Sequence, residues 1–315
     1  MRKALVVGIN DYPNSPLSGC VNDASSIAAL LEVDGDGSPN FSVRLLTSPS
    51  TSITRSVLRE AINNLFSGEP DMAVLFFAGH GLIKSTGGYL VTVDAKKYDE
   101  GVSMDEVLVI ANQSRAKNKV IILDCCHSGA MAAPALSGSA TAQLSEGLSV
   151  LTASRDKESS LEVNGSGVFT SLLSDALRGG AADLRGNITP GSLYAYVDEA
   201  LGAWDQRPIF RTNVTSFAKL RKIPPKVPSE VLRRITSYFV TPDAEHKLDP
   251  AYEDTDPSAD PVKVKIFKDL QKLQSVGLVV PVDAEFMYFA AINSTSCRLT
   301  ALGYQYWRLV NEKKL

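Results

Sequence analysis

The chain has 315 residues, enough for one large domain or for a medium-sized and a small one. Its composition, 44% hydrophobic and 21% charged, is ordinary for a globular protein, and no apolar run approaches the roughly 18 residues of a membrane span. The net charge of −3 argues against a general affinity for nucleic acid, and the four cysteines do not suggest a disulfide framework. The N-terminus lacks a signal-peptide pattern, so we expect a cytoplasmic protein.

The first two thirds of the chain alternate strand and helix patterns. Strands are predicted from short apolar runs at 3–9, 41–46, 72–77, 120–123 and 148–153. Helices are predicted from apolar residues at helical spacing at 20–32, 51–66, 104–113, 168–178 and 191–201. Residues 87–93 resemble part of a small hairpin, and 216–220 an edge strand. The alternation predicts an α/β fold with a mainly parallel central sheet flanked by helices.

A proline-rich segment, 223–228, separates this region from the rest, because prolines cannot continue a helix or a central strand. We therefore predict domains at 1–222 and 229–315. The second pattern comprises helices at 230–240, 262–276 and 300–312, an exposed acidic loop at 241–261 and a hairpin at 286–299. That order predicts a small α+β winged-helix-like domain.

The second predicted helix of the C-terminal domain carries four lysines: Lys263, Lys265, Lys268 and Lys272. They are suggestive of DNA binding, yet the pattern places them on several faces, and the acids and bases of the domain roughly cancel. We favour contact with a protein over contact with DNA. His246, alone in the acidic loop, is expected to be solvated.

Two strand ends carry reactive groups. The run KVIILDCCHSG, residues 119–129, leads from a buried strand into an acid, two thiols and an imidazole. The run FFAGHG, residues 76–81, ends another apolar strand at a histidine between glycines. Ligands of open α/β sheets bind beyond the carboxyl ends of such strands, so both runs point to an active site.

A cysteine nucleophile reacts as the thiolate and needs a base, usually histidine. Strand alternation places Asp124 and Cys126 on one side and Cys125 toward the core, so Cys126 is the predicted nucleophile. His127 is adjacent to Cys126 and poorly oriented to pair with it, which leaves His80 as the base.

An acid close to the nucleophile does not help to form a thiolate, since a like charge raises the thiol pKa. Asp124 is therefore expected to receive a cationic group of the substrate. The alternatives are that Asp124 orients backbone amides at the sheet edge and that Asp23 is a helix first-turn acid. No metal-type cluster, dinucleotide fingerprint or P-loop is present in the sequence, and no cofactor is predicted.

The runs FFAGHG and DCCHSG together resemble the caspase-like cysteine peptidases, and among them the metacaspases and their bacterial relatives. The segments LSGCVNDA at 17–24, FTSLL at 169–173 and QRP at 206–208 also fit, so the resemblance covers 1–222. It implies a Cys126–His80 dyad and an oxyanion hole from the backbone amides of Gly81 and Cys126. It also implies that Asp23 and Asp124 form an S1 pocket for arginine or lysine, of which arginine is the better guess.

Two features depart from many metacaspases. The acids after the histidine motif are spread out, which makes calcium dependence doubtful. Residues 128–154 contain no lysine or arginine, so a protease selective for basic residues cannot cut itself there. We therefore expect an endopeptidase activated by a partner, and the bacterial relatives suggest a defence or cell-death pathway. The alternative is a regulatory protein whose winged helix binds DNA or a partner while the caspase-like domain serves as a scaffold.

Overall fold

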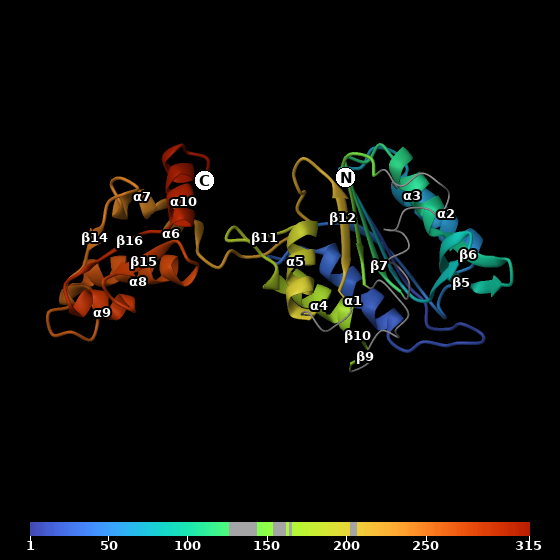
Figure 1. Cartoon of the computed structure of the whole chain (residues 1–315), viewed down its shortest axis with the longest axis horizontal. Coiled ribbons are helices and arrows are strands. Elements are labelled where there is room, and N and C mark those ends of the chain that lie inside the picture. The colour runs from blue at the N-terminus through green and yellow to red at the C-terminus, as the bar shows by residue number, and fades with distance from the viewer. Residues whose placement is uncertain (126–143, 154–161, 164–165, 202–206) are drawn as a thin grey trace. The chain divides into compact units, whose positions relative to one another are not determined.

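The computed structural model describes residues 1–125, 144–153, 162–163, 166–201 and 207–315. They form two compact units, both visible in Figure 1. Unit 1 comprises Met1–Asp183 and Asn187–Pro224, and unit 2 comprises Leu184–Gly186 and Pro225–Leu315. Within the described ranges, no helix has the length and apolar character that crossing a bilayer requires.

A six-stranded sheet forms the centre of unit 1, in the order β12-β8-β7-β3-β1-β2. Its strands are β1 (Arg2–Gly8), β2 (Ser42–Thr47), β3 (Met72–Ala78), β7 (Asn118–Asp124), β8 (Leu148–Thr152) and β12 (Ile209–Asn213). All neighbours are parallel except β12, which pairs antiparallel with β8. The predicted, mainly parallel α/β sheet is confirmed.

Helices cover both faces of this sheet (Figure 1). One face packs against α1 (Cys20–Glu32), α4 (Val168–Asp175) and α5 (Pro190–Leu201), and the other against α2 (Arg55–Phe66) and α3 (Met104–Gln113). A π-helical turn, Ala176–Gly180, extends α4. Because strands such as β3 are buried on both sides, their sequences are continuously apolar rather than alternating.

A second, antiparallel sheet lies beside α2 and α3. It consists of β4 (Gly81–Lys84), β5 (Gly87–Lys96) and β6 (Asp99–Ser103), so the predicted hairpin at 87–93 belongs to a three-stranded sheet. Among its described residues, unit 1 also contains two short antiparallel pairs: β9 (Glu162–Val163) with β10 (Ser166–Gly167), and β11 (Asn187–Ile188) with β13 (Arg221–Lys222).

The prediction of an edge strand at 216–220 is wrong, because these residues form no strand. The edge strand is β12, where the Thr212 hydroxyl lies 2.7 Å from that of Ser149 on β8. The apolar residues Ala218 and Leu220 pack on the core that contains α5 and do not join the sheet.

Unit 2 has its own core around a three-stranded sheet in the order β14-β16-β15. Its elements are α6 (Ser229–Arg233), α7 (Ile235–Tyr238), β14 (His246–Lys247), a 3-10 turn (Pro250–Tyr252), α8 (Pro261–Ser275), β15 (Val279–Val282), α9 (Met287–Ile292), β16 (Ser296–Leu299) and α10 (Ala301–Asn311). Asp260 caps α8 by accepting hydrogen bonds from the amides of Val262 and Lys263.

Three details of unit 2 differ from the sequence-based expectation. Residues 241–261 are not one exposed loop, because they contain β14 and the 3-10 turn and bury Leu248 and Tyr252. Residues 286–299 are not a hairpin, because Met287, Ala290 and Ala291 recur at helical spacing and form the buried side of α9. His246 is not solvated: its Nδ1 lies 2.9 Å from the carbonyl oxygen of Tyr238, and its Nε2 lies 3.0 Å from the hydroxyl of Tyr252.

Candidate active site

The two chemically distinctive runs leave the sheet side by side. In the parallel pair of β3 and β7, Phe77 aligns with Leu123 and Ala78 with Asp124. One step beyond, the amide of Gly79 donates to the carbonyl oxygen of Asp124 at 3.3 Å. The residues that follow, His80 on one strand and Cys125 on the other, therefore start from adjacent points of the same sheet edge.

The backbone of His80 is held on both sides by Tyr12, from the loop after β1, and Val91, from β5. The His80 amide donates to the Tyr12 hydroxyl at 3.0 Å, and the His80 carbonyl accepts from the amide of Val91 at 3.0 Å. The same Tyr12 hydroxyl donates to the Val91 carbonyl at 3.1 Å. Burial raises the pKa of Tyr12, so the hydroxyl keeps the proton that this donation needs.

The imidazole of His80 is oriented by a second contact from the same loop. Its Nε2 lies 2.7 Å from the carbonyl oxygen of Ser15, and its ring centroid lies 4.6 Å from that of Tyr12. A carbonyl oxygen only accepts, so in this contact Nε2 carries the proton. In the neutral ring, Nδ1 is then the nitrogen with a lone pair, and it can take a proton from a nucleophile.

Gly79 is required for this arrangement. A Cβ at residue 79 would lie 2.5 Å from the Tyr12 hydroxyl oxygen, closer than real side chains approach. Any larger residue would push Tyr12 away from the His80 amide. Residue 79 is therefore a glycine because a side chain would collide with Tyr12, and also because glycine lets the chain turn before His80.

Two buried acids lie on the opposite face of the sheet from Tyr12. Asp23, in the first turn of α1, accepts a hydrogen bond from the amide of Gly167 at 3.1 Å, and Asp124 accepts one from the Thr170 hydroxyl at 2.5 Å. A Cβ built on Gly167 would lie 3.0 Å from Oδ2 of Asp124 and 3.5 Å from Oδ2 of Asp23. The two carboxylates therefore adjoin the same glycine, although they are a hundred residues apart in sequence.

Burial is the main cause that raises the pKa of Asp124, to about 6. The negative charge of Asp23 raises it further, while the Thr170 hydrogen bond opposes the shift. At neutral pH the ionised Asp124 carboxylate therefore destabilises the folded protein. A cationic group placed beside the carboxylate would relieve that destabilisation, which is the behaviour expected of a pocket for a basic side chain.

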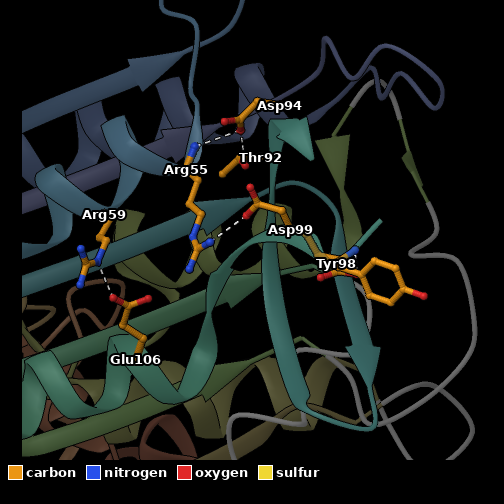
Figure 2. Close-up of polar contacts among 8 residues, drawn as sticks. Arg55, Arg59, Thr92, Asp94, Tyr98, Asp99 and Glu106 are labelled. Carbon is orange, nitrogen blue, oxygen red and sulfur yellow. Dashed lines mark hydrogen bonds and ion pairs between the residues drawn. The ribbon is translucent and has the colours of Figure 1, made fainter. Parts of the chain in front are cut away.

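The acids that follow the histidine motif are engaged in separate contacts (Figure 2). Asp94 accepts from the Thr92 hydroxyl at 2.7 Å and from the Arg55 amide at 3.0 Å, while Asp99 pairs with the Arg55 guanidinium at 2.7 Å. Glu100 pairs with Lys84 at 3.0 Å. In the part of the chain that the structure describes, no three His, Cys, Asp or Glu side chains are grouped to hold a metal ion.

Part of the predicted site can be placed. Gly81 is the first residue of β4 and aligns with Leu90 of β5. Cys125 is buried in the core that contains Tyr12 and Phe77, as strand alternation predicts. Cys126 and His127 lie outside the described residues.

The sequence reasoning missed the residues that support the site: Tyr12, Ser15, Gly167 and Thr170. A signal for Tyr12 was available, because a large aromatic in a loop rich in Pro, Ser and Gly usually has a packing partner. Ser15 acts through its backbone carbonyl, so its side chain carries no signal.

Comparison with known proteins agrees with this geometry. A family model described as the caspase domain matches residues 1–218. The chain belongs to the caspase-domain family. It is therefore a cysteine-type peptidase, and its central sheet with helices on both faces is the caspase-like fold.

Solved structures agree on the fold of this caspase-domain protein. Protein GSU0716 from Geobacter sulfurreducens has a TM-score of 0.51 and 18% identity, with 70% of this chain and 98% of that chain covered. Caspase-1 from Spodoptera frugiperda has a TM-score of 0.50 and 13% identity, with 70% and 90% covered. The comparison with curated proteins gave no match.

Proposed function

We propose that this caspase-domain protein is an endopeptidase that cleaves after arginine, or lysine, with Cys126 as nucleophile and His80 as base. The observation that carries the proposal is the grouping of functional side chains at one edge of the central sheet. An imidazole with a defined base nitrogen and a pair of buried carboxylates both adjoin the segment that leads into Cys126.

In the proposed reaction, Nδ1 of His80 takes the proton from the Cys126 thiol, and the thiolate attacks the carbonyl carbon of the scissile bond. The developing oxyanion is stabilised by the amides of Gly81 and Cys126. The protonated imidazole then gives its proton to the leaving amine. Water, deprotonated by the same imidazole, hydrolyses the thioester and restores the thiol.

Specificity is assigned to Asp23 and Asp124. A guanidinium can bind carboxylate oxygens through two parallel N–H groups, which favours arginine over lysine. Caspases that cut after aspartate would need basic groups in this pocket, and two acids repel such a substrate.

Activation is assigned to a partner. Residues 128–154 contain no lysine or arginine, so a pocket for basic residues offers no route to self-cleavage there. A protease gated by a partner in a bacterial defence or cell-death pathway is consistent with that feature. Unit 2, with its separate core, is the part we assign to partner contact.

The dyad is tested with fluorogenic peptides that carry arginine at P1. Cys126→Ala and His80→Ala should each abolish cleavage, whereas Cys125→Ala, which changes the neighbouring buried thiol, should retain it. Retained activity in either of the first two variants would remove that residue from the mechanism. Loss in Cys125→Ala alone would reassign the nucleophile.

The pocket and the gating are tested together with a positional-scanning peptide library, with and without candidate partner proteins. Asp124→Ala should weaken the preference for arginine at P1. A P1 profile unchanged from that of the unsubstituted protein would contradict the assignment of Asp124 to the pocket.

A further inference from the structure

Unit 2 contains a groove between α6 and α8, both labelled in Figure 1. It encloses about 580 Å³. Its floor is apolar: the accessible part is formed by Val264 from α8 and by Pro228 and Pro261 at the starts of the two helices, and Val231 from α6 is buried beside them.

The rim of the groove is basic. Lys265, Lys268 and Lys272 recur every three or four residues along α8, so they share one side of the helix, and all three line the groove. The sequence pattern predicts the four lysines of this helix on several faces, but only Lys263 lies off the side that the other three share. Lys263 points elsewhere, to Asp249 at 2.5 Å and to the ring of Tyr252.

The acids of the groove hold these lysines only weakly, since the contact of Lys272 with Asp269 is long, at 3.9 Å. Asp269, though part of the lining, is buried and accepts hydrogen bonds from the Arg234 guanidinium at 2.5 Å and from the Tyr238 hydroxyl at 2.6 Å. Lys268 pairs with Asp254 at 3.1 Å, with both side chains about half exposed. An exposed pair of this kind contributes little, so Lys268 can exchange its partner for a carboxylate of a ligand.

We propose that this groove binds an acidic amphipathic helix of a protein partner. The stripe from Pro261 to Lys272 is about 16 Å long, which matches about three turns of a helix. Apolar residues of the partner would cover Val264 and Pro261, and its acidic residues would meet the lysine rim. Such a helix would therefore contact both the apolar floor and the basic rim of the groove.

The apolar floor favours this occupant over DNA. A phosphate backbone gains nothing from an apolar surface, whereas the apolar side of an amphipathic helix is complementary to it. The role of the groove as the activating contact rests on the proposed function. Binding itself does not, and it is measured without any cleavage.

The test uses the full chain with Cys126→Ala, so that proteolysis cannot affect the outcome. A displayed library of random 16-residue peptides is selected on this protein, and enriched peptides are measured by fluorescence anisotropy at low and high salt. We expect sequences with acidic and apolar residues at helical spacing, whose affinity falls as salt rises.

The double variant Lys265→Glu/Lys272→Glu should bind these peptides at least about tenfold more weakly, because two attractive contacts become repulsive. Val264→Ser should weaken binding through the floor alone. The matched control, Lys313→Glu/Lys314→Glu, makes the same change of charge outside the groove and should bind as before. Circular dichroism checks that each variant is folded.

Several results would overturn the proposal. Enriched peptides without acidic residues would exclude an acidic ligand. Equal affinities of the groove and control double variants would show either no role for the groove or a nonspecific charge effect. Binding of duplex DNA that only the groove variant loses, without acidic peptides among those selected, would identify a nucleic-acid site instead. None of these results bears on cleavage, so a failure of the peptidase proposal is recognised separately.

Discussion

Replacing Asp124 with asparagine should stabilise the empty protein at neutral pH while weakening cleavage after arginine. The carboxyl group is buried, and its pKa is raised from 3.8 to about 6. Asparagine has nearly the same shape, can still accept the Thr170 hydrogen bond, and has an amide that can donate toward Asp23. The substitution therefore removes a buried charge with little change in packing.

The magnitude follows from the two pKa values. At about 1.4 kcal/mol per pKa unit, holding Asp124 ionised in the fold costs roughly 3 kcal/mol relative to the unfolded chain. The folded chain binds the proton of the Asp124 carboxyl more tightly than the unfolded chain does. The destabilisation caused by ionising Asp124 therefore begins as pH rises above about 4 and reaches its full value somewhat above about pH 6. The gain in the free energy of unfolding caused by Asp124→Asn should increase over the same pH range and should be small below about pH 4.

The assay is urea unfolding of both proteins, followed by circular dichroism at a series of pH values from about 4 to about 8. The control is Asp71→Asn, which removes an exposed acid whose pKa is lowered to about 2 by Lys117 and the N-terminal amine. The control should show no stabilisation at any of these pH values. A pH-independent difference for Asp124→Asn, or a loss of stability at neutral pH, would refute the reasoning about the pocket.

Three further predictions concern the surroundings of the site. Tyr12→Phe leaves the half-buried amide of His80 without its acceptor, a loss of about 1–3 kcal/mol, and should lower kcat by about tenfold or more with a smaller change in KM; an unchanged kcat would show that Tyr12 does not position the histidine. Gly79→Ala should destabilise the protein and lower kcat as well, because its Cβ would displace the Tyr12 hydroxyl; wild-type unfolding curves would contradict that contact. Activity toward arginine peptides should persist in excess chelator, since Asp99 is engaged with Arg55; complete loss that added calcium reverses would disprove calcium independence.

The sequence by itself determined the central sheet and the position of the site along the chain. Runs such as Met72–Phe77 are continuously apolar, and a segment of that kind is stable only as a strand covered on both faces. Alternation along β7 likewise determined that Cys125 faces the core. These features depend on local pattern, which a single sequence displays directly.

Only the tertiary structure decided how the site is supported. The proton position on the His80 ring depends on Ser15, 65 residues away, and the position of the His80 backbone depends on Tyr12, 68 residues away. The environment of Asp124 depends on Thr170, 46 residues away. The register that joins such segments is determined by which faces pack together, and no local pattern reveals it. The same holds for the lysines of α8: their spacing is visible in the sequence, but the groove they line exists only because α6 packs beside them.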